Sequence, residues 1–189
     1  MPKPQPHSLY LERLLSETFP AVAELLGAEV GVFRGENSAH LLFALPNLYL
    51  YLVDAWRPDP YLLQRNRFHA LAKGPANRFS IWESQARRAV AFAGRRAAIR
   101  KQDFRSTAGT PPELDFVFLD AAHSFADTAD QISVWSRRVR SGGIVSGHDY
   151  DYPAPGFEGV RKAVDEAAAR LNVELTVDST SYVWHWTQP

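Results

Sequence analysis

Short runs of apolar residues recur along the chain, and between them apolar residues return every three or four positions. The runs cover residues 28–33, 48–54, 114–120 and 144–146, and a weaker run covers residues 97–101. Continuous apolar runs of this length are typical of strands that are covered on both faces, as in a parallel sheet. The pattern therefore predicts five buried strands.

The stretches between these runs have the period of amphipathic helices. Ser8 is the predicted cap of a first helix that ends before Pro20, and Ser124 and Asp127 suit the start of a later one. The sequence Ser-Ile-Trp-Glu at 80–83 fits a capping box and predicts a helix to about residue 92. Further helices are predicted at residues 21–26, 38–44, 61–72 and 160–171, and residues 1–7 are predicted to be an irregular tail.

Two alternating stretches close the chain, at residues 173–177 and 182–186, and they suit an antiparallel pair. Strands that alternate with helices favour an α/β fold. We expect a doubly wound, mostly parallel seven-stranded sheet with a terminal antiparallel β-pair. Residues 1–189 are predicted to be one domain, with a helical extension at 1–27 and the core at 28–189.

Composition places the chain among ordinary globular proteins. Of its 189 residues, 46% are hydrophobic and 22% are charged, a usual balance for a folded domain. The absence of cysteine excludes disulfides, thiolate metal sites and a cysteine nucleophile. Because no early apolar run resembles a signal peptide and no stretch is long enough to span a bilayer, we expect a cytoplasmic protein with no membrane partner.

Charge is unevenly distributed along a chain that is neutral as a whole. Residues 57–105 carry 12 Lys and Arg against 3 acids, a net charge of +9, so the remainder carries −9. A basic segment of this kind can face an anionic substrate or partner, and it can also be a solvated helix surface. The solvated surface is the more ordinary interpretation.

The first strand is followed by a glycine turn and a helix start. Gly31 and Gly35 allow the backbone to turn sharply and to approach a ligand closely. Asn37 or Ser38 is the predicted helix cap. This arrangement predicts a site for a nucleotide-like ligand, and Asp54, which ends the second strand, suits a grip on two ribose hydroxyls.

Two further positions suit an adenine. Trp56, just after Asp54, can cover the ring, or it can simply pack within its loop. Asp103 and the backbone of Phe104 follow the strand at 97–101, where an adenine would be held by a carboxylate and an N–H; a turn cap is the other interpretation of Asp103.

Four stretches together resemble the class I S-adenosylmethionine-dependent methyltransferases, and most of all the small-molecule O-methyltransferase-like branch called methyltransferase family 24. The likeness extends over residues 29–186. It is carried by the Glu-x-Gly-x-x-x-Gly turn with Ser38 after it, the strand that ends at Asp54, the segment LDFVFLDAAHSF, and the segment SGGIVSGHDYDYPAPGFEGVRKAVDE.

The resemblance implies a Rossmann-like methyltransferase fold, S-adenosylmethionine as cofactor and a small-molecule acceptor that is methylated at oxygen. It also implies a role for several residues by motif. The methionine part of the cofactor is lined by Glu29, Gly31 and Gly35, the ribose is held by Asp54, the adenine is held by Asp103 and Phe104, and Asp120 lies below the sulfonium.

Methyl transfer to a hydroxyl group requires that the acceptor loses its proton. His123 and His148, at the ends of the fourth and fifth strands, are the predicted bases, with Asp149 beside His148. Alternatively Asp120 and Asp149, with an imidazole beside them, can hold a divalent metal such as Mg²⁺. His148 stands where this metal pattern would have an acid. The remaining histidines, at positions 7, 40, 69 and 185, are predicted to be structural or exposed.

Other functions remain open on the sequence. A cofactor-binding protein of this fold with different chemistry, such as a hydroxylase-like natural-product enzyme, would differ only in its product. A nucleic-acid-modifying methyltransferase would use the basic residues 57–105 and is ranked last, because no base-reading signature follows the fourth strand. The aromatic end of the chain, with Tyr182, Trp184 and Trp186, suits either a homo-oligomer interface or the packing of the last strand.

Overall fold

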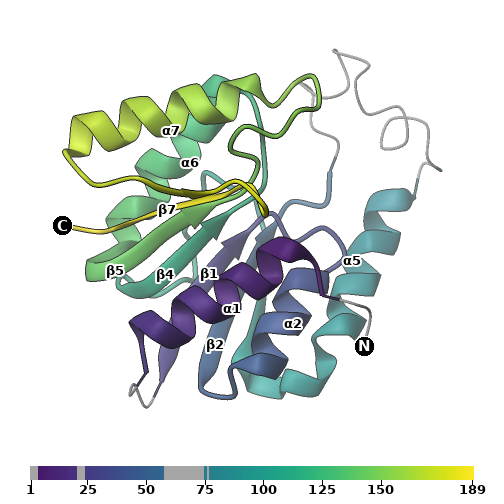
Figure 1. The fold of residues 1–189 in the computed structure, drawn as a ribbon. Coiled ribbons are helices and arrows are strands. Elements are labelled where there is room, and N and C mark those ends of the chain that lie inside the picture. The colour runs from purple at the N-terminus through teal and green to yellow at the C-terminus, as the bar shows by residue number, and fades with distance from the viewer. Residues whose placement is uncertain (1–3, 21–23, 58–74, 76) are drawn as a thin grey trace.

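A twisted seven-stranded sheet forms the centre of the protein (Figure 1). The computed structural model describes residues 4–20, 24–57, 75 and 77–189. The strands lie in the order β3-β2-β1-β4-β5-β7-β6. Their bounds are Leu25–Val30 for β1, Leu48–Asp54 for β2, Ala97–Lys101 for β3, Leu114–Leu119 for β4, Val139–Gly147 for β5, Thr176–Asp178 for β6 and Val183–Thr187 for β7.

The strands β1 to β5 are parallel to one another, and β7 pairs antiparallel with both β5 and β6. The chain order reverses between β1 and β4, which is the place where open α/β sheets bind ligands. The predicted fold class, a doubly wound sheet with a terminal antiparallel pair, is confirmed.

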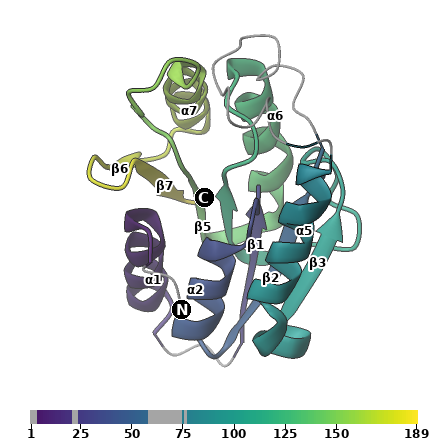
Figure 2. The same cartoon turned by 90° about the vertical axis from the view of Figure 1, so that its right-hand side faces the viewer.

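Helices cover both faces of the sheet (Figures 1 and 2). One face carries α1, α2 and α5, and the other carries α6 and α7. Their bounds are Pro6–Thr18 for α1, Glu36–Ala44 for α2, Arg78–Ala89 for α5, Phe125–Trp135 for α6 and Glu158–Leu171 for α7, with short 3₁₀ turns at Ala91–Arg96 and Ser136–Arg138. No helix in the described ranges is both long and apolar enough to cross a membrane.

The two-sided cover explains the apolar run of β4. Phe116 and Phe118 point into the cluster shared with α1, α2 and α5, while Val117 and Leu119 point into the cluster shared with α6 and α7. All four side chains are buried. Because successive side chains of a strand point to opposite faces, a strand between two helix layers must be apolar at every position.

The N-terminal elements begin and end differently from the prediction. Helix α1 starts at Pro6 with Gln5 as its N-cap, and Ser8 lies buried inside the helix rather than capping it. Proline suits the first helical position because its φ is preset and its missing N–H is not needed there. Strand β1 starts at Leu25, so the predicted helix at 21–26 is wrong for its last two residues, and residues 21–23 lie outside the described part.

The predicted caps of α2 and α5 are also wrong. Gly35, in the left-handed conformation with φ 79°, precedes α2, and no side chain caps the helix. Asn37 and Ser38 instead donate hydrogen bonds to the buried carboxyl of Glu29. A buried carboxyl without a hydrogen-bond partner costs more free energy than a helix end that water can reach and that has no side-chain cap. Helix α5 begins at Arg78, two residues before the predicted capping box, and the helix predicted at 61–72 lies outside the described residues.

Other local predictions are confirmed. Strand β3 has the predicted bounds. The Oγ of Ser124 caps α6 by accepting the N–H of Asp127 at 3.0 Å. Trp184 and Trp186 are each 1% exposed, so these two side chains of β7 pack within the core and do not offer a free surface.

Candidate active site

The first half of the site is the turn between β1 and α2. Gly31 has φ 97°, and a Cβ there would lie 2.2 Å from the carbonyl oxygen of Asp120. Gly35 has φ 79°, and a Cβ there would lie 3.0 Å from the Cα of Ala86 in α5. The turn therefore fits against β4 and α5 only as long as both residues are glycine.

Asp54, at the end of β2, holds this turn through its carboxylate. Its Oδ2 accepts the N–H groups of Val32 and Phe33, both at 2.9 Å, and its Oδ1 accepts the N–H of Trp56 at 2.7 Å. A carboxylate has about four acceptor positions. Asp54 can thus shape the turn and still accept a hydrogen bond from a ligand hydroxyl.

Phe33 and Trp56 are joined by a hydrogen bond, and each has a strained backbone conformation. Their φ angles are 53° and 41°, in the left-handed region, which bulky residues rarely adopt because it strains the backbone. The indole Nε1 of Trp56 donates to the carbonyl oxygen of Phe33 at 2.8 Å, and the Trp56 residue is 5% exposed. Loop packing accounts for this position, and a contact of Trp56 with adenine stays a prediction.

Glu29 lies beneath the turn and is 2% exposed. Its carboxyl group accepts from the amide of Asn37 at 3.1 Å and from the hydroxyl of Ser38. Burial raises the pKa of Glu29 to about 8, because it outweighs the hydrogen bonds from Ser38 and Asn37, which lower it. Near neutral pH this carboxyl is therefore mainly in its neutral form.

The residues predicted to hold adenine follow β3. The carboxylate of Asp103 pairs with the guanidinium of Arg57 and accepts the N–H of Arg105 at 2.9 Å. The carbonyl oxygen of Phe104 accepts the indole N–H of Trp135 at 2.6 Å. These bonds fix the loop against α6, and the role of Asp103 and Phe104 in adenine binding stays a prediction.

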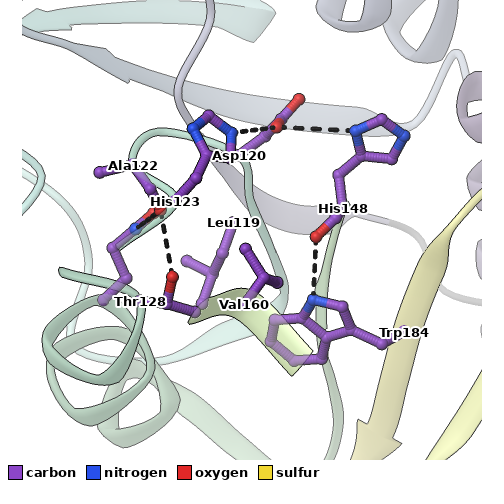
Figure 3. A pocket seen from close by; sticks show the side chains of 9 residues that line it. Leu119, Asp120, Ala122, His123, Thr128, His148, Val160 and Trp184 are labelled. Atoms are coloured by element: carbon purple, nitrogen blue, oxygen red, sulfur yellow. Dashed lines mark hydrogen bonds and ion pairs between the residues drawn. The ribbon is translucent and has the colours of Figure 1, made fainter. Parts of the chain in front are cut away.

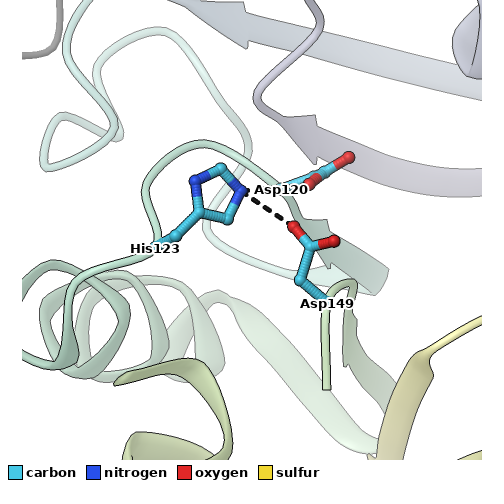
Figure 4. Close-up of side chains that lie close together, drawn as sticks. All are labelled: Asp120, His123 and Asp149. Atoms are coloured by element: carbon cyan, nitrogen blue, oxygen red, sulfur yellow. Dashed lines mark ion pairs between the residues drawn. The ribbon is translucent and has the colours of Figure 1, made fainter. Parts of the chain in front are cut away.

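The second half of the site is a cluster of two carboxylates and two imidazoles at the ends of β4 and β5 (Figures 3 and 4). His123 Nε2 lies 2.9 Å from Asp149 Oδ2, and His148 Nδ1 lies 3.1 Å from Asp149 Oδ1. Both imidazoles also approach Asp120 Oδ1, each at 3.7 Å. The prediction that these strand ends bring their side chains together is met by the geometry.

The cluster holds its charges through mutual pairing. Burial alone would lower the pKa values of His123 and His148, but their pairing with the carboxylates of Asp120 and Asp149 outweighs it and raises them to about 9 and about 11. In return, the two histidines keep the pKa values of Asp120 and Asp149 below the ordinary value despite burial. Near neutral pH the cluster thus consists of two imidazolium ions and two carboxylates.

Three of these side chains could also surround a metal ion. One ligand atom each from Asp120, His123 and Asp149 lie within 4.8 Å of one another (Figure 4). The donor set is two carboxylate oxygens and one imidazole nitrogen. Imidazole suits transition metals such as Zn²⁺ better than Mg²⁺, which prefers oxygen ligands.

Hydrogen bonds from side chains of α6 and β7 fix the loops that carry the cluster (Figure 3). Thr128 Oγ1 donates to the carbonyl oxygen of Ala122 at 3.2 Å, and Trp184 Nε1 donates to the carbonyl oxygen of His148 at 3.2 Å. A small pocket opens between these loops on the side of α6 and α7. It is lined by Leu119, Asp120, Ala122, His123, Thr128, Gln131, His148, Val160 and Trp184.

Sequence reasoning missed two neighbours of the cluster. Phe157, before α7, has its ring centroid 4.6 Å from that of His123. His7, in the first turn of α1, has its ring centroid 4.6 Å from that of His148. The sequence predicts only that His7 is structural or exposed, and the structure places it beside His148. Pro6 was a signal for a helix start that would have moved His7 from an irregular tail into a helix.

Comparison with known proteins gives the family. A family model described as a methyltransferase domain, number 24 of that series, matches residues 28–150. The chain belongs to this methyltransferase family. The matched region of the methyltransferase contains both halves of the site, from Glu29 to Asp149, while His7 lies outside it. Among curated proteins no sequence matches.

Solved structures agree in fold. The O-methyltransferase NovP is 20% identical with a TM-score of 0.67, and the match covers 96% of this chain and 79% of NovP. A caffeoyl-CoA O-methyltransferase assigned by inference in Staphylococcus aureus is 8% identical with a TM-score of 0.67, over 96% of this chain and 81% of that one. The O-methyltransferase TomG from Streptomyces achromogenes, solved with S-adenosylmethionine, is 22% identical with a TM-score of 0.60. The match covers 97% of this chain and 80% of TomG.

Proposed function

We propose that this methyltransferase transfers a methyl group from S-adenosylmethionine to an oxygen of a small-molecule acceptor. The observation that carries the proposal is the direct contact between the two halves of the site. The Gly31 turn packs on the backbone of Asp120, which begins the carboxylate–imidazole cluster. A ligand held along the turn would therefore present one end to the cluster.

The residues of the first half fit the cofactor. The glycine turn is open to a ligand because it carries no side chain at Gly31 and Gly35, and Asp54 retains an acceptor position for a ribose hydroxyl. Glu29 lies toward the methionine part. When bound, the cofactor supplies an activated methyl group on a sulfonium. We assign the adenine end to Asp103, Phe104 and Trp56.

The residues of the second half would act on the acceptor. His123 and His148 hold their protons near neutral pH, so each can donate a hydrogen bond to an acceptor oxygen or stabilise a developing negative charge. A group that already carries its proton cannot take up another one. The bases predicted from the sequence are thus better suited to orientation than to the first proton transfer.

A divalent cation is a second way to activate the acceptor. Asp120 and Asp149, with His123, would hold it, and it would supply Lewis-acid chemistry. The imidazole favours a transition metal such as Zn²⁺ over the Mg²⁺ expected from the sequence. Removal of metal with EDTA, followed by addition of each ion separately, would decide between this arrangement and the protonated cluster.

An oxygen acceptor is supported by the neighbours NovP and TomG, whose names describe them as O-methyltransferases. Nucleic acid is the weaker alternative. Several cations of residues 57–105 are paired within the protein: Arg57 with Asp103, Arg87 and Lys101 with Glu83, and Arg105 with Asp127. Nucleic-acid binding would weaken steeply with salt.

Calorimetric titration with S-adenosylmethionine, with and without EDTA, tests the cofactor. Mass spectrometry then tests transfer to a panel of phenols, catechols and monosaccharides. We expect saturable binding and a product heavier by one methyl group in place of a hydrogen. A folded protein that binds no cofactor would overturn the proposal, and a hydroxylated product would favour the hydroxylase-like alternative.

A further inference from the structure

Helix α1 brings His7 to the carboxyl end of the sheet. The helix is anchored on both sides, because the hydroxyl of Tyr10 hydrogen-bonds His185 of β7 at 3.0 Å and Glu12 pairs with His40 of α2 at 2.7 Å. Leu11, on the same helix, is fully buried. The anchors fix the first turn of α1 over the ends of β4 and β5 rather than leaving it free.

His7 lies against the cluster without being bonded to it. Its ring is stacked over Phe118 at 6.1 Å and tilted against His148 at 4.6 Å between centroids. Among the described residues, neither ring nitrogen of His7 has a hydrogen-bond partner. The imidazoles of His123 and His148, in contrast, each point one nitrogen at Asp149.

The surroundings of His7 favour the neutral imidazole. Burial lowers the pKa of His7, and it outweighs the carboxylates of Asp120 and Asp149, which raise it; His148 and His40 add to the lowering. In the described part of the chain, the titratable groups that act on His7 are thus Asp120 after β4, His148 and Asp149 after β5, and His40 in α2. His7 is thus a half-buried imidazole whose nitrogens have no hydrogen-bond partner among the described residues, and it lies beside His148, which is paired with Asp149.

We propose that His7 binds the acceptor hydroxyl and takes up its proton during methyl transfer. This assignment rests on the proposed function and adds a residue outside the matched methyltransferase domain. As the new oxygen–carbon bond forms, the sulfur–carbon bond of the sulfonium breaks and its electron pair stays on sulfur. The hydroxyl proton passes to a ring nitrogen of His7, which afterwards releases it to water.

The kinetic test compares substitutions of two histidines: His7 lies in α1, and His40 pairs with Glu12 of α1. H7F keeps a ring against Phe118 and His148 but removes the nitrogens, whereas H40A removes the Glu12 anchor and leaves His7 intact. For the panel acceptor that the wild type methylates fastest, we expect H7F to lower kcat about 100-fold, with the Kd for S-adenosylmethionine within about twofold of wild type, as for any residue that meets only the acceptor. H40A should retain most of the wild-type kcat.

Two further readouts separate a catalytic from a structural role of His7. Added imidazole should restore part of the activity of H7A, and H7F should lose the acidic limb of the pH–rate profile. The proposal is overturned if H7F keeps kcat within about threefold of wild type, if H40A loses as much as H7F, or if imidazole restores nothing.

An acceptor-free measurement keeps this inference separate from the proposed function. Imidazole ¹⁵N–¹H NMR spectra of the wild type, assigned with H7F, report the form of each ring. We expect His7 to be neutral at pH 7 while His123 and His148 are protonated. A protonated His7 would refute the assignment even if the enzyme is active, and a wild type that methylates no panel acceptor would refute the proposed function and the assignment with it.

Discussion

Glu29 and Asp120 are two carboxyl groups at the same edge of the sheet, and near neutral pH the first is protonated while the second is ionised. Glu29 lies on β1 and Asp120 follows β4, and these strands pair with each other, with Val30 opposite Leu119. Burial raises the pKa of Glu29 to about 8, whereas hydrogen bonds from two histidines overcome burial and lower the pKa of Asp120. The difference comes from the partners, since Glu29 contacts neutral Asn37 and Ser38.

This contrast divides the site into a half built mainly from backbone amides and a half built from paired charges. Around Gly31 the backbone amides and one carboxylate, Asp54, give a rigid turn that suits recognition of a ligand. Around Asp149 the side chains carry full charges that balance one another. We expect variants of the first half to change cofactor affinity and variants of the second half to change turnover.

The largest expected effect is that of Asp54→Ala on cofactor binding. The substitution removes the acceptor of three backbone N–H groups and the proposed ribose contact, so the Kd for S-adenosylmethionine should rise by about 100-fold or more. Calorimetry measures this, and circular dichroism should show a folded protein. Asp115→Asn is the matched control, because Asp115 also accepts a backbone N–H of β1, from Leu26 at 2.6 Å, but at the opposite end of the strand.

His148→Ala should have the opposite pattern of effects, with a lower kcat and an unchanged affinity for S-adenosylmethionine. The variant removes a cation that would donate a hydrogen bond to the acceptor oxygen and stabilise its developing negative charge, so kcat should fall by about 100-fold. Its Kd for S-adenosylmethionine should stay within about twofold of wild type, since the first half is untouched. Unchanged turnover would remove His148 from the catalytic residues.

Glu29→Gln tests the neutral carboxyl through the pH dependence of stability. The pKa of Glu29 is raised from 4.5 to about 8 in the folded state, so its contribution is fully present below pH 4.5 and is lost as pH rises toward 8. Gln keeps the neutral state, so the variant should gain several kcal/mol relative to wild type as pH rises across this window. Urea unfolding at several pH values measures the difference.

Glu83→Gln is the control for that series. The pKa of Glu83 is lowered by hydrogen bonds from Lys101 and Arg87, so its contribution is present above the unfolded pKa and is lost at low pH. The E83Q variant should therefore show no gain toward pH 8. A difference between wild type and E29Q that is constant with pH would contradict the neutral carboxyl.

The smallest expected effect is that of Trp56→Phe. The variant removes the hydrogen bond from the indole to the carbonyl oxygen of Phe33 but keeps an aromatic ring in the core. The free energy of unfolding should fall by about 1 kcal/mol. Urea unfolding measures it, and a stability equal to that of wild type would show that this link does not hold the strained turn.

Much of the fold could be predicted because its signals are local. The apolar runs of β2 and β4 mark strands that are buried on both faces, and Ser124 caps α6 as expected. The local signal failed where a distant group competed for the same side chain. Asn37 and Ser38 have the chemistry of caps, but the buried carboxyl of Glu29 takes their hydrogen bonds.

The order of residues along the chain is enough to place Asp54, Asp120 and the pair His148 and Asp149 at the carboxyl ends of the strands. A parallel sheet gathers such positions at one edge, so their neighbourhood follows from the order of the strands. Which of these groups carry protons, and that His7 lies among them, depends on how the chain folds in space. A pKa depends on burial and on partners in space, and His7 is separated from His148 by most of the chain.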